Sequence, residues 1–320
     1  MFIYIKKILI PLLLVAGIGW PESSCSKGNG SAAPADTTAT KPVTPKDTFA
    51  LANGVNLQPS YYNSGNVSFG WTLMQANAKI KSVRIEIEPA VPIALAASWI
   101  AAAQQHGYQV VATYHKYTVL GSDDASELAA AGTWWKNNYA TLAASGAFTI
   151  NLMNEWGSHN ITASAYAAAY NTAIASVRSV YKGFIIIDIP GWGQEAQTAA
   201  DAVKGTGGAA ISDEKIVLST HIYPGGWNQA KNRWVNSSDI DALLATGRAC
   251  MVGEFGGSGT GGADWSGMVS YAKQKGCAIL AWSWNGDGGD MNMVSPKWAD
   301  QPGATDFSTS TYFNTVYPLL

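Results

Sequence analysis

Eight short apolar segments, each followed by an amphipathic or alanine-rich segment, run through the chain from residue 49 to its end. Apolar runs of this length predict buried strands, and the longer segments between them predict helices. Strands that alternate with helices indicate a parallel sheet, and eight of them favour closure into a (β/α)8 barrel, the TIM-barrel fold. The predicted strands are Gly54–Gln58, Ser82–Glu88, Gln109–His115, Phe148–Glu155, Phe184–Ile189, Ile216–Tyr223, Cys250–Phe255 and Ala278–Trp284.

The predicted helices fill the gaps between these strands, and several of them end beside a glycine. Glycine adopts the left-handed conformation that ends a helix without steric cost. An open, doubly wound sheet is the alternative fold, but the glycine-rich phosphate loop typical of that fold does not follow the first strand. The best-defined helices are expected over Pro92–His106, Thr162–Tyr181, Ser238–Thr246 and Asp264–Lys275, with a last one over Thr309–Leu320.

The N-terminal segment predicts export. Lys6 and Lys7 precede an apolar run, Ile8–Trp20, that proline and glycine interrupt and that is too short to span a bilayer stably. Cys25 follows in a context that resembles a bacterial lipoprotein signal, in which the cysteine becomes the lipidated N-terminus, although Glu22 stands where an aliphatic residue is usual. We expect a lipoprotein of the outer membrane or cell surface, or a secreted or periplasmic protein.

The chain therefore divides into three predicted regions. Residues 1–24 form a signal peptide, of the lipoprotein type. Residues 25–47 consist mostly of Gly, Ser, Ala, Pro, Thr and Lys without apolar periodicity, which indicates a flexible linker. Residues 48–320 form a single (β/α)8 domain.

The composition argues against some classes of partner. The formal net charge is −2 and no run of Lys or Arg follows residue 7, so neither nucleic acid nor an anionic membrane surface is an expected partner. The chain has 13 Trp and 14 Tyr, whose flat faces suit the C–H faces of sugars and equally suit a protein core. No cluster of Cys and His suggests a metal site, and we expect no cofactor.

Two pairs of residues leave structural alternatives open. Cys250 and Cys277 begin neighbouring predicted strands, and export permits a disulfide between them, but two buried thiols are at least as well supported. Asp287 and Asp290 lie among glycines, where a turn is favoured over a cation site.

Polar and aromatic residues gather at the C-terminal ends of the predicted strands. In a (β/α)8 barrel these ends meet at one face, which carries the active site. The fourth strand ends in Asn154 and Glu155, and the seventh strand ends at Glu254. A strand interior is a costly place for such polar groups, whereas a strand end opens into a cleft. The other candidates, each of which is also compatible with packing or a structural ion pair, are Arg84, His115, Trp192, His221, Tyr223, Trp282 and Trp284.

Glu155 and Glu254 fit the chemistry of glycosidic bond cleavage. This reaction needs an acid that protonates the leaving oxygen and a group that stabilises or attacks the anomeric carbon. Carboxyl groups about 5–5.5 Å apart retain the anomeric configuration through a covalent intermediate, and more distant pairs invert it. The acid needs a raised pKa, while Arg84, His221 and Tyr223 are candidates to lie beside the nucleophile. One isolated Glu more often forms a salt bridge or caps a helix, but two flanked by such residues favour catalysis.

Taken in order, these motifs resemble those of glycoside hydrolase family 5, a family of retaining (β/α)8 glycosidases, over about residues 49–320. The resemblance rests on Val-Arg-Ile at Arg84, His115, Leu-Met-Asn-Glu at Asn154 and Glu155, Thr-His-Ile-Tyr at His221 and Tyr223, Val-Gly-Glu-Phe-Gly at Glu254, and Ala-Trp-Ser-Trp at Trp282.

The resemblance implies a role for each matched residue. Glu155 would be the acid/base and Glu254 the nucleophile. Asn154 would bind the 2-hydroxyl of the sugar in the −1 subsite, and Tyr223 would donate a hydrogen bond to the nucleophile. Arg84 and His221 would position the carboxylates, and Trp282 would lie under the −1 sugar. His115 is a further substrate-binding candidate, as are Trp192 and Trp284 on the aglycone side.

Within the family, Asp188-Ile-Pro-Gly-Trp-Gly-Gln and Ala-Trp-Ser-Trp-Asn-Gly-Asp-Gly resemble segments of the β-mannanases. The expected activity is therefore an endo-1,4-β-mannanase that acts on β-mannan by double displacement, as a monomer. An endo-β-1,4-glucanase is the alternative, because mannose and glucose differ only at C2. A catalytically silent glycan-binding lipoprotein is less favoured, since both acids and the residues that orient them are present.

Overall fold

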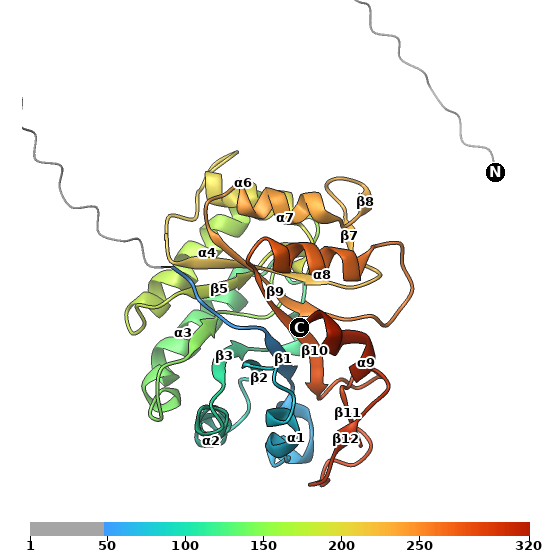
Figure 1. Ribbon diagram of the computed structural model, residues 1–320. Coiled ribbons are helices and arrows are strands. Elements are labelled where there is room, and N and C mark those ends of the chain that lie inside the picture. Colours follow the sequence, from blue (N-terminus) through green and yellow to red (C-terminus); the bar gives the residue numbers. More distant parts are fainter. Residues whose placement is uncertain (1–47) are drawn as a thin grey trace, which may run out of the picture. The chain divides into compact units, whose positions relative to one another are not determined.

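Parallel strands form a closed barrel in the computed structural model, which describes residues 48–320 (Figure 1). The barrel strands are β1 (Gly54–Leu57), β2 (Ser82–Ile87), β3 (Gln109–Tyr114), β4 (Thr149–Asn151), β5 (Ile185–Asp188), β6 (Ile216–Ile222), β9 (Ala249–Phe255) and β10 (Ala278–Asn285). Each of these eight strands pairs with the barrel strands before and after it in the chain, and β1 pairs with both β2 and β10. The predicted (β/α)8 fold is confirmed. The predicted signal peptide, linker and Cys25 lie outside the described residues.

Helices surround the barrel (Figure 1). Several begin where the sequence supplies a capping side chain: Asp124 accepts from the backbone N–H of Ser126, and Thr162 accepts from that of Ala165. The helices are α1 (Trp71–Gln75), α2 (Ile93–Gln105), α3 (Ala125–Leu142), α4 (Ala163–Arg178), α5 (Pro190–Gly193), α6 (Ala196–Lys204), α7 (Ser237–Leu244), α8 (Trp265–Gln274) and α9 (Phe313–Val316).

Short elements complete the described chain. The strands β7 (Trp227–Asn228) and β8 (Arg233–Trp234) form a hairpin in the connection that follows β6, and β11 (Val294–Ser295) pairs with β12 (Ser308–Thr309) after β10. Single 3-10 turns are η1 (Pro59–Tyr61), η2 (Asn63–Gly65), η3 (Tyr117–Val119) and η4 (Tyr317–Leu319).

The barrel interior has an apolar layer and a polar layer. Near the N-terminal ends of the strands, one cluster of buried apolar side chains is separate from the larger core between strands and helices. Closer to the C-terminal ends, buried side chains are polar or charged, as Arg84, Asp188 and Glu254 illustrate. The apolar cluster consists of Val111, Ile186, Val217, Met251, Ala278 and Leu280.

Two predicted elements differ from the observed ones. The fourth strand, predicted to continue to Glu155, ends at Asn151, and Glu155 adopts a left-handed backbone conformation with φ 48°. The prediction that Leu152–Glu155 belongs to this strand is therefore wrong. The predicted helix Thr309–Leu320 is helical only over Phe313–Val316, with a 3-10 turn after it, because Pro318 offers no N–H to continue an α-helix.

Cys250 and Cys277 are buried free thiols, so the structure shows no disulfide between them. Burial raises the pKa of both thiols, that of Cys277 to about 11. Both side chains therefore stay protonated at neutral pH, as expected of inert core cysteines.

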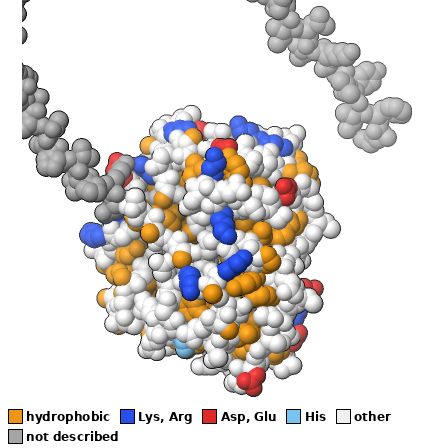
Figure 2. Space-filling view, in the orientation of Figure 1, with side chains coloured by type: hydrophobic (Ala, Val, Ile, Leu, Met, Phe, Trp, Pro, Cys, Tyr) orange, Lys and Arg blue, Asp and Glu red, His pale blue; other side chains and the backbone are white. Residues whose placement is uncertain are grey.

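The described surface mixes side-chain types. On the face drawn in Figure 2, Lys and Arg side chains lie in small separate groups among apolar and uncharged ones. Within residues 48–320, every helix is too short or too polar to cross a membrane.

Candidate active site

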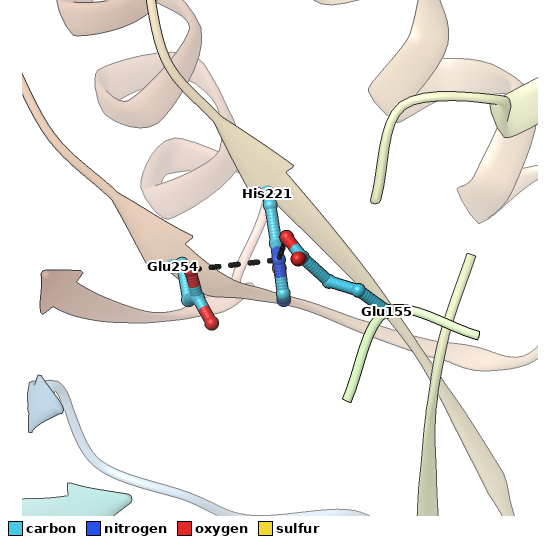
Figure 3. A group of neighbouring side chains, drawn as sticks. All are labelled: Glu155, His221 and Glu254. Atoms are coloured by element: carbon cyan, nitrogen blue, oxygen red, sulfur yellow. Dashed lines mark hydrogen bonds and ion pairs between the residues drawn. The ribbon is translucent and has the colours of Figure 1, made fainter. Parts of the chain in front are cut away.

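Glu155 and Glu254 converge at the C-terminal ends of the barrel strands (Figure 3). Glu254 is the sixth residue of β9, whereas Glu155 follows β4 and is held by a hydrogen bond from its own backbone N–H to Oδ2 of Asp188, at 3.1 Å. One oxygen of each glutamate and one nitrogen of His221 lie within 4.8 Å of one another. This separation fits the spacing of about 5–5.5 Å for carboxyl pairs that retain configuration, and leaves no room for the water of an inverting pair.

Arg84 donates hydrogen bonds to the residues around these acids. Its Nη1 donates to Oε1 of Glu254 at 2.9 Å and to Oε1 of Glu86 at 2.7 Å. Its Nη2 donates to Oδ1 of Asn154, and its Nε donates to Oδ1 of Asn151 at 2.9 Å. Arg84 is 1% exposed, so these bonds operate away from water. The fixed fork of guanidinium donors therefore orients several side chains at once.

Glu254 is surrounded as a nucleophile needs to be. Oε1 accepts from Arg84, and Oε2 accepts from the hydroxyl of Tyr223 at 2.8 Å. Burial and the neighbouring charge of Glu254 raise the pKa of Tyr223 well above its usual value, so the phenol keeps its proton and donates it to this hydrogen bond. Both oxygens of Glu254 are therefore held in place by hydrogen-bond donors.

His221 lies between the two acids. Its Nδ1 is 2.7 Å from Oε1 of Glu155 and 3.6 Å from Oε2 of Glu254, and its Nε2 is 3.6 Å from Oδ2 of Asp188. Burial lowers the pKa of His221, but the charges of Glu254 and Asp188 outweigh burial and raise it well above the usual value. Burial likewise raises the pKa of Asp188, while His221 and Arg84 lower it to about 2. The imidazole is therefore a cation at neutral pH.

The surroundings of Glu155 suit an acid. Burial raises its pKa, the hydrogen bond from His221 lowers it, and the charge of Glu254 raises it, with a net increase. A carboxyl group with a raised pKa keeps its proton at a higher pH than a free glutamate does, which suits Glu155 to the role of proton donor.

The glutamates and His221 also have the composition of a metal-ligand set. A protonated imidazole cannot ligate a cation, and Nδ1 of His221 already contacts Glu155 at 2.7 Å. The arrangement therefore fits hydrogen-bonded acid catalysis better than metal binding.

A cavity of about 400 Å³ opens beside the two acids. It contains the predicted residues His115, Asn154, Tyr223 and Trp282, and four residues that the sequence patterns did not single out. The signal for these is their place in the chain, since they follow the first and third strands, where side chains reach the active-site face. The four are Gln58, Tyr61, Tyr117 and Leu120.

Trp282 lines this cavity, and hydrogen bonds hold both its indole ring and its backbone. Its indole Nε1 donates to Oδ1 of Asp287 at 3.0 Å, and its backbone oxygen accepts from the hydroxyl of Tyr312 at 2.7 Å. Asp287 also accepts from the backbone N–H groups of Gly289 and Met291. The turn favoured for Asp287 is confirmed, and this turn holds the indole plane in place.

His115 belongs to a second hydrogen-bonded group at the cavity. Its Nδ1 lies 2.6 Å from the hydroxyl of Tyr61 and 3.3 Å from Oε1 of Glu88, and Tyr61 also donates to Glu88. Burial lowers the pKa of His115, but Glu86 and Glu88 outweigh burial and raise it. His115 therefore orients Tyr61 at the wall of the cavity.

The two tryptophans assigned to the aglycone side differ. Trp284 is 0% exposed and its Nε1 donates to the backbone oxygen of Phe69, so its assignment to substrate binding is wrong. Trp282 and Trp284 are two residues apart in β10, so strand alternation predicts that both face the same side. In the structure all of β10 is buried, and of these two residues Trp282 alone lines the cavity. Trp192 is 38% exposed beside His159, with ring centroids 5.3 Å apart, and remains a candidate platform.

Sequence comparisons identify proteins to which the chain is similar. Residues 72–288 match the family model described as "Cellulase (glycosyl hydrolase family 5)". The chain is 30% identical over 199 residues to a mannan endo-1,4-beta-mannosidase of Salipaludibacillus agaradhaerens, which covers 60% of this chain and 63% of that protein. It is 29% identical over 185 residues to a mannan endo-1,4-beta-mannosidase of Streptomyces lividans, which covers 56% of this chain and 47% of that protein. The chain thus spans about half to two thirds of these relatives.

Solved structures share the fold. The catalytic domain of a mannanase from Streptomyces sp. SirexAA-E superposes with a TM-score of 0.66 at 22% sequence identity, over 83% of this chain and 84% of that one. At this level of identity the likeness supports the barrel architecture.

Proposed function

The chain belongs to glycosyl hydrolase family 5, and we propose that it is a retaining, endo-acting glycoside hydrolase that cleaves internal β-1,4-mannosidic bonds of mannans. The observation that carries the proposal is the pair Glu155 and Glu254, whose carboxylate oxygens lie within 4.8 Å across the cavity mouth. This spacing supports double displacement.

In the first step, a carboxylate oxygen of Glu254 attacks the anomeric carbon as the bond to the leaving oxygen breaks. Glu155 gives its proton to that oxygen, and a covalent glycosyl–Glu254 ester remains. Arg84 and Tyr223 hold Glu254 in position, and Asn154, itself fixed by Arg84, faces the same cavity. The cationic His221 stabilises the negative charge that Glu155 acquires.

In the second step, the ionised Glu155 removes a proton from a water molecule that attacks the anomeric carbon. The ester bond breaks and returns the electron pair to Glu254, and the product keeps its β configuration. Trp282 offers a flat surface at the cavity for the sugar ring, as aromatic side chains do in carbohydrate sites.

The choice of mannan rests on the relatives, two of which are mannan endo-1,4-beta-mannosidases. An endo-β-1,4-glucanase is the second candidate, because the matching family model bears the description Cellulase. The two substrates differ at C2 of each sugar, where discrimination takes only a few contacts.

Reducing-sugar release from soluble galactomannan and from carboxymethylcellulose, measured side by side, tests the substrate. Release from galactomannan alone is expected. Release from carboxymethylcellulose alone would keep the two-carboxylate mechanism and replace mannan by glucan. No release from either polymer would favour the silent glycan-binding protein.

Variants of the two acids test the mechanism. Glu155→Ala and Glu254→Ala should each lower turnover by more than about 10⁴-fold while the fold is kept. With an aryl glycoside, azide should rescue Glu155→Ala and give a β-glycosyl azide, because the nucleophile remains. Glu127→Gln, on the surface helix α3, is the matched control with normal turnover. A folded Glu254→Ala variant with near-normal turnover would contradict the mechanism.

We propose further that the protein is exported and acts on extracellular polysaccharide, with Cys25 as a lipid anchor and simple secretion as the alternative. The basic, apolar and cysteine-containing order of residues 6–25 supports export. Metabolic labelling with a palmitate analogue should mark the protein and leave Cys25→Ser unlabelled.

A further inference from the structure

Glu86 is a buried carboxylate that the proposed mechanism does not use. It lies on β2, two residues after Arg84, and is 0% exposed. Its Oε1 accepts from Nη1 of Arg84 at 2.7 Å, and its Oε2 lies 3.4 Å from Nε2 of His115. A buried carboxylate is stable only where hydrogen-bond donors surround it, and Arg84 and His115 leave some acceptor positions of Glu86 unfilled.

The remaining donor is the side-chain amide of Gln58, the residue that follows β1. Its Nε2 donates to Oε2 of Glu86 at 2.7 Å. The two ends of a glutamine amide have nearly the same shape, so the hydrogen-bond partner decides which end faces which way. Burial raises the pKa of Glu86, and the charges of His115 and Arg84 oppose this effect. In the structure both oxygens of Glu86 act as acceptors, one from Arg84 and the other from the amide nitrogen of Gln58. Glu86 therefore holds the nitrogen of Gln58, and the amide oxygen Oε1 points away from it.

The side chain of Gln58 lies at the active-site cavity. Gln58 lines that cavity together with Tyr61 and Trp282. Within residues 48–320, no protein group donates a hydrogen bond to this oxygen, yet it is not one of the buried side-chain atoms that lack a partner. The oxygen is therefore not buried, and it has a free acceptor position for a ligand.

We propose that Gln58 accepts a hydrogen bond from a hydroxyl group of the glycone, and that Glu86 is a positioning residue that fixes the Gln58 amide in this orientation. The inference rests on the proposed glycosidase function. On this proposal Gln58 favours sugars that carry a hydroxyl group opposite its amide oxygen.

The order of the barrel strands places Gln58 on the glycone side. In the proposed mechanism Glu155 protonates the leaving oxygen, so the aglycone lies on the Glu155 side of the cavity, and Trp192 after β5 is exposed and available to contact it. β1 lies four positions from β5 around the eight-stranded barrel, on the opposite side. A side chain that follows β1 therefore meets the part of the substrate on the other side of the cleaved bond.

The first test uses 4-nitrophenyl β-mannobioside, or the matching cellobioside if the protein is a glucanase. All sugars of these substrates lie on the glycone side, and the same nitrophenyl group occupies the aglycone side for the wild type and each variant. Gln58→Met keeps the size of the side chain and removes the acceptor, and should lower kcat/KM by about tenfold. Gln75→Met makes the same change at an exposed glutamine of α1 and should leave kcat/KM unchanged.

The second test, Gln58→Glu, separates positioning from simple packing. When the introduced carboxyl group is protonated, it has the shape of the glutamine amide, donates to Glu86 and keeps an acceptor for the sugar. The variant should therefore approach wild-type kcat/KM at acidic pH. On deprotonation, two carboxylates meet at hydrogen-bond distance, and the ratio of variant to wild-type kcat/KM should fall as pH rises. The charged and titratable groups that face this pair are Arg84, His115, Tyr61 and Glu254.

Each outcome bears on a different statement. Activity of the wild type on neither aryl substrate would overturn the proposed function and this inference with it. An active wild type with an unchanged Gln58→Met variant would overturn the inference alone. If Gln58→Met is impaired but the activity ratio of Gln58→Glu does not depend on pH, the positioning role of Glu86 is wrong. Recovery of Gln58→Glu at acidic pH supports the whole proposal, because a misfolded variant would not recover.

Discussion

Arg84 shows how a single residue organises the polar half of the barrel. It donates to side chains from β1, β4 and β9 as well as to Glu86 on its own strand. Arginine suits this position because its guanidinium keeps its charge and offers five donors in a fixed plane. Lysine would supply the charge but not the geometry. Glu254 is thus oriented by a partner that cannot titrate in the working pH range.

His221 is the residue through which pH should act on the reaction. Replacing it by Gln removes a cation that favours the ionised form of Glu155, so the pKa of Glu155 should rise further. Because Glu155 must be protonated for the first step, the alkaline limb of the kcat/KM profile should move to higher pH, with a lower maximum. Profiles of the wild type and His221→Gln on one aryl glycoside check this. An alkaline limb that moves to lower pH would contradict the assignment of Glu155 as acid.

At the scale of elements, the eight barrel strands are predictable from the sequence because their signal is local. A short apolar run that begins after a glycine or polar turn and leads into a helix is typical of a buried parallel strand, and predicted starts such as Gln109 and Ala278 agree with the structure. The same reasoning predicts that Glu155 and Glu254 lie at the active-site face, and the structure brings them together there although β4 itself ends at Asn151.

What could not be predicted depends on packing between distant segments. β4 ends early because the chain turns at Glu155, which has a φ of 48°. Asp188, on the next strand, accepts a hydrogen bond from the backbone N–H of Glu155 and holds this turn. The burial of Trp284 depends on Phe69, 215 residues away in sequence, as the hydrogen bond between them shows. The position of Gln58 against Glu86 likewise requires two strands to be aligned first.

The pairing of β1 with β2 depends on a glycine. A Cβ on Gly54 would lie 1.9 Å from the backbone oxygen of Ser82, its partner in the ladder. Gly54→Ala should therefore force the strands apart and lower the free energy of unfolding by about 2–3 kcal/mol. Urea unfolding of this variant beside Gly303→Ala, where a Cβ meets nothing within 4 Å, provides the comparison. Equal midpoints for the two variants would show that β1 adjusts freely.

For the whole molecule, the charges inside the barrel link stability to pH. Asp188 has a pKa of about 2 in the folded state, because His221 and Arg84 outweigh the effect of burial. Its pKa in an unfolded chain is about 3.9. The unfolded state therefore binds more protons as the pH falls, so this stabilisation is complete above about pH 4 and is lost as the pH falls through about 2.

Asp188→Asn should remove this contribution, which amounts to about 2–3 kcal/mol at neutral pH. Urea unfolding at pH 5 and pH 3 should show a smaller loss of stability on acidification for the variant than for the wild type. The same loss in both proteins would mean that Asp188 is not selectively stabilised by folding.

The apolar and polar layers of the barrel interior consist of different residues, so stability and the proposed activity depend on different parts of the barrel. The apolar layer contains Val111, Val217 and Leu280, and the buried polar side chains lie nearer the C-terminal ends of the strands. Different substitutions should therefore change heat tolerance and turnover. Substitutions in the apolar layer and the outer helices should therefore change heat tolerance with little effect on the proposed glycosidase reaction, and substitutions in the loops at the active-site face should change sugar preference without altering the barrel.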